Sequence, residues 1–250
     1  MIDLHAHILP GLDDGVRTIE EARALARHAS AEGVAAVAAT PHVRADYPTR
    51  AEQMEARVAE LRADFAEQGI ALQILHGGEV DLSFGSSLSS GELRRFTLAQ
   101  NERHLLLEFP YRGWPPYLSG SVVELVELGF VPVLAHPERN AAVRAAPERL
   151  GELVRLGALV QITAASLDGR LGRSSREAAL RLLELRLAHV LASDAHTPEI
   201  RAAGLAAAAD ALGDAGLARY LTEEAPAAIV AGEAVAHPPP LRRRRRLLFF

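Results

Sequence analysis

The sequence predicts an α/β fold, a closed barrel of seven strand–helix units of the TIM type. Seven short apolar runs each end in a polar residue, and a helix-patterned segment follows each of them. None of the runs alternates strictly between apolar and polar residues, which is typical of strands buried on both faces in a parallel sheet. Seven such units of about 30 residues favour a barrel. The runs cover residues 2–7, 34–42, 71–79, 104–110, 130–139, 158–166 and 189–196.

Helix-patterned segments lie between these runs. The first begins at Thr18, which is expected to form a capping box with Glu21, and it ends near Gly33. Five further helices are expected over residues 50–68, 119–128, 147–156, 174–187 and 199–212. The alternative is an open doubly wound sheet, but the glycine-rich dinucleotide fingerprint that would favour it does not follow the first strand.

The alternation of strands and helices is unbroken, so we expect one domain over residues 1–236. Residues 237–250 form a tail with three prolines, five consecutive arginines at positions 242–246 and four terminal apolar residues. This composition predicts a disordered terminus. Docking to a partner or to an anionic surface is the alternative role for the tail.

Composition excludes several classes of function. Without the five tail arginines, 22 basic residues (27 minus 5) face 32 acidic ones, a balance of −10 that disfavours nucleic-acid binding. The chain has no cysteine, which excludes zinc–thiolate sites and thiolate nucleophiles and suits the cytoplasm. No apolar run approaches the ~18 residues needed to span a bilayer, and no signal peptide is visible. We therefore expect that the chain is not an integral membrane protein. The sequence is compatible with a homo-oligomer.

Side chains of metal-ligand type end six of the seven runs. Because the carboxyl ends of barrel strands converge on one face, these side chains are expected to meet in a single mouth. Asp14, in the loop after the first run, can reach the same place. The eight residues at the strand ends are His5, His7, His42, Glu79, Glu108, His136, Asp194 and His196.

This set of side chains indicates a multinuclear metal site. Four carboxylates forced together without positive charge would repel one another, and divalent cations remove that repulsion. Oxygen and imidazole ligands without sulfur suit Mn, Fe, Zn or Co. Nine ligands are too many for one ion and fit two or three ions that share bridging carboxylates. No organic cofactor is indicated.

The charge of such a site points to phosphate chemistry. Three divalent ions and four carboxylates would give the mouth a net charge of about +2, which suits a phosphate dianion. Metal ions also lower the pKa of bound water and so generate a hydroxide nucleophile. Arginine completes a phosphate clamp by bidentate hydrogen bonds, and Arg139 and Arg201 are the candidates. His196 is a candidate both for metal binding and for protonating the leaving oxygen.

The motifs HAHILPGLDDG, TPH, GGEV, LLLEFP, AHPERN and SDAH occur in this order from Met1 to about Arg201. They resemble the polymerase-and-histidinol-phosphatase (PHP) superfamily and, more narrowly, the bacterial manganese-dependent protein-tyrosine phosphatases of capsular and exopolysaccharide synthesis. The resemblance implies a distorted seven-stranded barrel, a trinuclear manganese site, and dephosphorylation of the tyrosine-rich tail of a cognate kinase that controls polysaccharide export.

The resemblance also implies a distribution of the ligands. His5, His7, Glu79 and Asp194 match the ligands of one metal, with Glu79 bridging. Glu108 and His136 match ligands of a second ion, and Asp14, His42 and His196 those of a third. Arg139 and Arg201 are similar to the phosphate-binding arginines, although the TPEIRAAGL sequence after SDAH departs from the usual pattern around Arg201.

Two other functions stay open at this point. A small-molecule phosphatase, such as a histidinol-phosphate phosphatase, would use the same metals with a different rim. A noncatalytic module that binds phosphotyrosine is the other alternative, and intact ligands argue against it. Three aromatic residues after Glu108 are candidate stacking groups for a phenyl phosphate, with plain loop packing equally expected: Tyr111, Trp114 and Tyr117.

Overall fold

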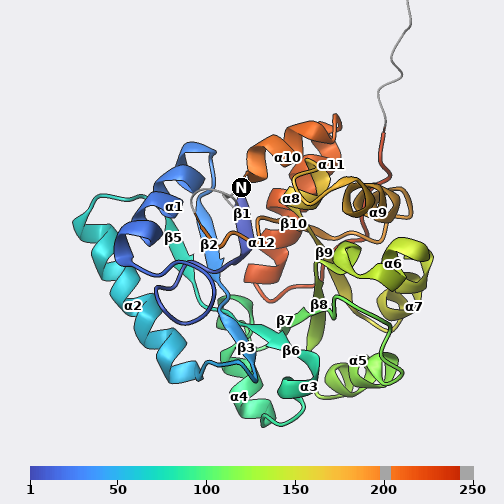
Figure 1. Ribbon diagram of the computed structural model, residues 1–250, viewed down its shortest axis with the longest axis horizontal. Coiled ribbons are helices and arrows are strands. Elements are labelled where there is room, and N and C mark those ends of the chain that lie inside the picture. The colour runs from blue at the N-terminus through green and yellow to red at the C-terminus, as the bar shows by residue number, and fades with distance from the viewer. Residues whose placement is uncertain (198–203, 243–250) are drawn as a thin grey trace, which may run out of the picture.

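Ten short strands form the centre of the molecule, and helices surround them (Figure 1). The structure, a computed structural model, describes residues 1–197 and 204–242. Every pair of neighbouring strands in these residues is parallel except β3 and β4. The strands are β1 (Ile2–Ala6), β2 (Ala36–Ala39), β3 (His42–Arg44), β4 (Tyr47–Pro48), β5 (Gln73–Leu75), β6 (Glu79–Asp81), β7 (His104–Glu108), β8 (Val131–Ala135), β9 (Leu159–Thr163) and β10 (Val190–Ala192).

Each of the seven predicted runs contains strand, so the predicted α/β architecture is confirmed. Two of the runs are broken: the second gives β2 and β3, and the third gives β5 and β6. The pairing is therefore divided between a sheet of order β1–β2–β5 and a sheet of order β10–β9–β8–β7–β6–β3–β4. A parallel bridge between Ala6 and Ala195 connects β1 with the segment after β10. The arrangement is thus a distorted strand system with breaks rather than a regular barrel.

The strands are buried on both faces, as the absence of strict alternation predicts. In β7, Leu105 and Leu107 belong to the large apolar cluster packed against the surrounding helices, whereas Leu106 belongs to a smaller cluster. The smaller cluster contains Leu4 of β1 and Ile229 of the C-terminal helix α12 (Ala225–Val230). Both faces of the strands therefore exclude water, which favours continuous apolar runs.

Most predicted helices are present with end points shifted by a few residues. The predicted segment 147–156 begins as a 3-10 turn, η3 (Pro147–Arg149). Within the predicted segment 199–212, the structure describes residues 204–212. The corresponding helices are α1 (Ile19–Ala31), α2 (Ala51–Glu67), α5 (Leu118–Glu127), α7 (Leu150–Arg155), α9 (Arg173–Glu184) and α10 (Leu205–Ala211).

The capping box predicted at the start of α1 is half formed. The Thr18 side chain accepts a hydrogen bond from the Glu21 backbone N–H at 3.2 Å, as expected. The Glu21 carboxylate, however, accepts from the backbone N–H of Arg17 at 2.7 Å and from its guanidinium at 2.9 Å. A charged partner next to Thr18 competes for the Glu21 carboxylate, so the reciprocal bond of the box is not made.

Several elements have no counterpart among the predicted segments. They are the helices α3 (Leu82–Gly85), α4 (Ser90–Arg95), α6 (Ala141–Ala145), α8 (Ala164–Leu167) and α11 (Ala215–Arg219), the 3-10 turns η1 (Leu98–Gln100) and η2 (Pro137–Arg139), and the π-helical turn η4 (Tyr220–Glu224). Most of them are shorter than two helical turns, too short for a periodic apolar pattern to reveal. No helix among the described residues is both long and apolar enough to cross a bilayer.

The first residues of the predicted tail lie against the domain. The Pro238 carbonyl accepts a hydrogen bond from the Arg186 guanidinium at 2.8 Å, and the Arg242 backbone N–H donates to Asp214 at 2.7 Å. Leu241 packs against the large apolar cluster. Residues 243–250, which include most of the arginine run, lie outside the described residues.

Candidate metal centre

All nine predicted ligands lie in one connected cluster, where most end or follow a strand, whereas His42 and Glu79 begin β3 and β6 just after the breaks. The ligand atoms form four groups, and the atoms of each group lie within 4.8 Å of one another. Because the groups share residues, the cluster is continuous. Convergence of parallel strand ends brings these residues together from distant parts of the sequence. The groups are His7 with Asp14, His42 and His196; His5 with Glu79 and His136; His5 with His7 and Asp194; and His42 with Glu79 and Glu108.

Glu79, at the start of β6, lies at the centre of the cluster. Its Oε2 atom is 3.4 Å from His5 Nε2, 3.4 Å from His7 Nε2 and 3.0 Å from His42 Nδ1. Its Oε1 atom is 2.8 Å from His136 Nε2. A fully buried carboxylate that touches four imidazoles has the position of a bridging ligand between cations.

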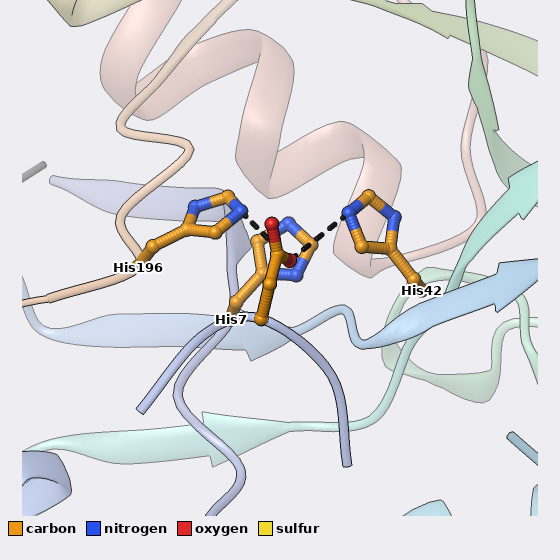
Figure 2. Close-up of side chains that lie close together, drawn as sticks. His7, His42 and His196 are labelled. Carbon is orange, nitrogen blue, oxygen red and sulfur yellow. Dashed lines mark ion pairs between the residues drawn. The ribbon is translucent and has the colours of Figure 1, made fainter. Parts of the chain in front are cut away.

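Asp14 is the outermost member of the cluster. Its Oδ1 atom lies 3.3 Å from His42 Nε2 and 3.4 Å from His196 Nε2. Figure 2 shows His42 and His196 approaching one carboxylate from opposite sides, with His7 close by. The ring centroid of His7 lies 3.9 Å from the ring centroid of His196 and 4.6 Å from that of His42. The PGLDDG loop thus places Asp14 over three imidazoles, as predicted from the sequence.

Several buried atoms of the cluster have no hydrogen-bond partner among the described residues. They include Glu108 Oε2 and the pair His42 Nδ1 and Glu79 Oε2, which lie 3.0 Å apart as an ion pair without hydrogen-bond geometry. Buried polar atoms are normally satisfied, and each exception calls for a cause. These three belong to one of the four groups, and imidazole nitrogen and carboxylate oxygen are the donors that Mn, Fe, Zn and Co accept. The residues therefore fit divalent cations.

The cluster shifts the pKa values of its two buried glutamates in opposite directions. Burial opposes ionisation of Glu79, but the positive field and close contacts of His5, His136 and His42 hold its pKa well below the usual value. Burial also lowers the pKa of His42, yet close contacts with Asp14 and Glu79 outweigh it and raise the pKa to about 9. Burial raises the pKa of Glu108, and repulsion from Glu79 adds to the shift. Repulsion between these two carboxylates is what a bound cation would remove.

Two side chains outside the predicted set orient the first pair of histidines. His5 Nδ1 donates to Gln161 Oε1 at 3.0 Å, and His7 Nδ1 donates to Asp13 Oδ2 at 2.6 Å. Both bonds leave the Nε2 atoms of the rings facing the carboxylates. Asp13 also accepts from the His42 backbone N–H at 2.9 Å. Such partners set the tautomer and direction of metal-binding imidazoles. The adjacent DD pair was a signal for Asp13, whereas no pattern pointed to Gln161.

Gly15 allows the Asp13–Asp14 loop to fold back onto the first strand. A Cβ atom at this position would lie 2.3 Å from the His7 carbonyl oxygen and 2.4 Å from its Cβ, so that only glycine fits. Two ligands have backbones in the left-handed region: His136 at φ 37° and Asp194 at φ 53°. Strain of this kind in residues other than glycine concentrates at functional sites.

A pocket of about 330 Å³ opens over the cluster. Arg139 lines it and donates to Asp194 Oδ2 at 2.8 Å, so this predicted phosphate-binding arginine does reach the site. Arg201 lies outside the described residues. The pocket is lined by Asp14, His42, Arg44, Tyr111, Arg139, Asp194 and His196. Arg44 was not among the predicted residues, although it lies two residues after His42, a signal of the kind that marks Arg139 three residues after His136.

The three aromatic residues after Glu108 have different positions. Tyr111 lines the pocket, and its ring stacks on His136 with centroids 5.5 Å apart and an interplanar angle of 6°. Trp114 instead packs edge-on against Phe109, with the Arg149 guanidinium over its ring. The Tyr117 hydroxyl lies 3.1 Å from that of Ser83. Of the three, only Tyr111 borders the pocket.

The whole domain matches a known family. The family described as "Capsular polysaccharide synthesis, CpsB/CapC" matches residues 1–226. The chain belongs to the CpsB/CapC family. CapC of Staphylococcus aureus is 37% identical over 199 residues, which cover 79% of this chain and 77% of CapC. Tyrosine-protein phosphatase YwqE of Bacillus subtilis is 35% identical over 202 residues, which cover 80% of this chain and 79% of YwqE.

A solved structure confirms the CpsB/CapC fold over nearly the full length. It comes from the crystal structures of YwqE from Bacillus subtilis and CpsB from Streptococcus pneumoniae, described there as metal-dependent tyrosine phosphatases. The TM-score is 0.86 at 31% sequence identity, covering 98% of this chain and 100% of the other. The family named from the sequence motifs is therefore confirmed, and the match extends past the motifs to α10–α12.

Proposed function

We propose that this CpsB/CapC protein is a metal-dependent protein-tyrosine phosphatase that hydrolyses phosphotyrosine in a protein substrate. One observation carries the proposal: nine imidazole and carboxylate ligands meet under a single pocket that Arg139 and Tyr111 also line. Dianionic phosphate suits the cations and the arginine, and a phenyl ring suits the aromatic side of the pocket. Relatives in the family carry the same activity in their names.

We propose that three divalent cations, with manganese as the first choice, occupy the cluster. His5, His7, Glu79 and Asp194 would hold one, and Glu108 and His136 a second that Glu79 bridges. Asp14, His42 and His196 would hold the third. The orphaned His42, Glu79 and Glu108 atoms and the central position of Glu79 support this distribution.

The cations and the pocket residues would have different roles in hydrolysis of the phosphate ester. Bound cations would supply charge neutralisation for the phosphate and a lowered pKa for an attacking water. Arg139 presents its guanidinium to the phosphate oxygens while it holds Asp194. His196 Nδ1 donates to the Asp194 carbonyl oxygen at 3.0 Å, which leaves Nε2 as a lone-pair donor. That tautomer supports His196 as a ligand rather than as the acid for the leaving phenolate.

The proposed substrate is the tyrosine-rich tail of a bacterial tyrosine kinase that regulates exopolysaccharide synthesis. The family description, which names capsular polysaccharide synthesis, supports this choice. We also propose a cytoplasmic location, which agrees with the absence of cysteine from the sequence. No role for nucleic acid is proposed, because the body of the chain is acidic.

The test compares two substrates on protein of known metal content. Elemental analysis of the purified chain should find Mn or another divalent transition metal, and turnover of a phosphotyrosine peptide should exceed that of histidinol phosphate. Much faster turnover of histidinol phosphate would make the chain a small-molecule phosphatase. Tight binding of the phosphopeptide without release of phosphate, at full metal loading, would make it a binding module.

A further inference from the structure

Two similar arrangements of histidine, tyrosine, arginine and carboxylate border the pocket, and each contributes an arginine to its lining. In the first, the ring of Tyr111 stacks on the ligand His136, and the Arg139 guanidinium lies 4.7 Å from the Tyr111 centroid. Arg139 then donates to one oxygen of the ligand Asp194 at 2.8 Å. The order is histidine, tyrosine, arginine and carboxylate.

The second arrangement lies on the β3–β4 hairpin. The ring of Tyr47 stacks on the ligand His42, with centroids 5.8 Å apart and an interplanar angle of 19°. The Arg44 guanidinium lies 5.3 Å from the Tyr47 centroid and donates to one oxygen of the ligand Glu108 at 2.9 Å. The order of side-chain types is the same, although the two sets come from different parts of the sequence.

Both arginines leave one carboxylate oxygen for the cluster. Arg139 binds Asp194 Oδ2, while Oδ1 is 3.4 Å from His5 Nε2. Arg44 binds Glu108 Oε1, while Oε2 is 3.8 Å from His42 Nδ1 and has no hydrogen-bond partner among the described residues. Arg44 Nε also lies 2.8 Å from Asp46 Oδ1. A guanidinium has five N–H donors, so Arg44 keeps donors beyond those near Glu108 and Asp46, and Arg139 keeps donors beyond the one that Asp194 takes.

We infer that Arg44 is a second phosphate-binding arginine, which acts on the substrate in the pocket that Arg139 also lines. Both Arg44 and Arg139 line the pocket, and their side chains are only 23% and 15% exposed. The cation–π contact with Tyr47 holds the Arg44 guanidinium in place before substrate arrives, which reduces the entropy cost of binding. This inference rests on the proposed phosphatase function for its substrate, but the phosphate contact itself can be measured separately.

The first measurement is binding of inorganic phosphate to the metal-loaded protein by titration calorimetry. For Arg44→Ala we expect phosphate to bind about 10- to 100-fold more weakly, the usual effect of losing a hydrogen bond between charged groups. Arg44→Lys keeps the charge but not the planar fork, and we expect an intermediate loss. Arg139→Ala is the positive control. Arg94→Ala is the matched control, since the Arg94 guanidinium lies 4.9 Å from the Phe130 centroid, outside the pocket.

The second measurement is metal content of each variant, followed by kcat and KM for p-nitrophenyl phosphate and a phosphotyrosine peptide. Unchanged metal content with weaker phosphate binding supports the inference. Loss of metal from Arg44→Ala, with normal phosphate affinity once metal is restored, would overturn it and leave Arg44 as a residue that only orients Glu108.

A higher KM for the peptide alone, with inorganic phosphate and p-nitrophenyl phosphate bound normally, would also overturn it, because Arg44 would then contact the peptide. If the wild-type protein binds phosphate through Arg44 but turns over no phosphotyrosine, the proposed function fails and the inference about Arg44 stands.

Discussion

Buried histidines occur at both ends of the strands, and the two groups have opposite surroundings. At the carboxyl ends, His5, His7 and His42 face carboxylates that outweigh the effect of burial and raise their pKa values. At the amino ends, burial among apolar groups lowers the pKa of His104 and of His189 to about 4. The same residue type thus carries a proton beside carboxylates at one end, where a bound cation would replace that proton, and stays neutral at the other.

The hydrogen bonds of the two groups explain this difference. Asn101 donates to His104 Nδ1 at 3.1 Å, and the Val160 backbone N–H donates to His189 Nδ1 at 3.2 Å. These rings act as neutral acceptors within a completed hydrogen-bond pattern. The histidines of the metal centre instead face carboxylates, and the cluster retains buried atoms without hydrogen bonds. Burial alone therefore does not identify a ligand, whereas unsatisfied neighbours do.

Removal of metal should affect only the carboxyl end, with the largest expected effect. Treatment with a chelator should abolish phosphatase activity, and added manganese should restore it. Loss of a ligand bound only by the folded state also lowers the free energy of unfolding, by about 2.7 kcal/mol if the metal was present at 100 times its Kd. Activity assays and thermal unfolding before and after chelation measure both effects. Full activity after complete removal, checked by elemental analysis, would contradict the proposed mechanism.

Substitution of the central carboxylate tests the same end through one residue. We expect Glu79→Gln to lower kcat/KM by about 10³-fold or more, because a ligand shared by several cations is lost. Metal content should fall with it. His189→Asn, at the opposite end, is the matched control and should retain metal and activity. A Glu79→Gln variant with normal metal content and turnover would remove Glu79 from the centre.

Asp13→Asn is expected to have a smaller effect, because Asp13 acts through His7. Loss of the charged acceptor of the His7 Nδ1–H bond should weaken metal affinity about 10- to 100-fold, the usual range for partners of metal-binding histidines. Titration of the metal-free protein with manganese gives the affinity. Asp64→Asn, which removes a partner of Arg23 outside the centre, serves as the control. Equal affinities for the Asp13→Asn variant and the wild type would show that the bond does not orient the ring.

The amino-end histidines predict a pH effect on stability of roughly 1–3 kcal/mol. Burial depresses the pKa of His189 in the folded state to about 4, while the unfolded chain titrates near 6.5. The unfolded state therefore binds more protons between these values, and the free energy of unfolding falls as pH decreases from about 6.5 toward 4. Urea unfolding of metal-free protein at pH 7 and pH 5 should show a smaller decrease for His189→Asn than for wild type. An equal decrease would place the acid sensitivity elsewhere.

The fold could be predicted largely from local pattern, and its deviations could not. Continuous apolar runs separated by helical segments indicate parallel strands because burial on both faces leaves no place for alternating polar residues. The breaks between β2 and β3 and between β5 and β6 fall at residues 40–41 and 76–78, where Pro41 and the Gly77–Gly78 pair interrupt the apolar runs. Pro132, however, lies within the unbroken strand β8, so residue type alone does not decide where the pairing stops.

The candidate metal ligands were predictable because they obey a simple rule of position. Each ends or follows an apolar run, and the carboxyl ends of parallel strands must meet. Gln161 lies inside a predicted strand and does not follow that rule, so its contact with His5 at 3.0 Å shows only in the structure. Arg44 lies two residues beyond His42, much as Arg139 lies three beyond His136, but its contact with Glu108 at 2.9 Å also requires the tertiary structure.

By itself the amino-acid order determined the strand–helix alternation, the family and the set of candidate metal-binding side chains, because these depend on residue type and spacing along the chain. The tertiary structure alone decided which histidines are held neutral and that Arg44 shares a pocket with Arg139. Those properties depend on distances between atoms far apart in the sequence and on how completely neighbouring groups exclude water.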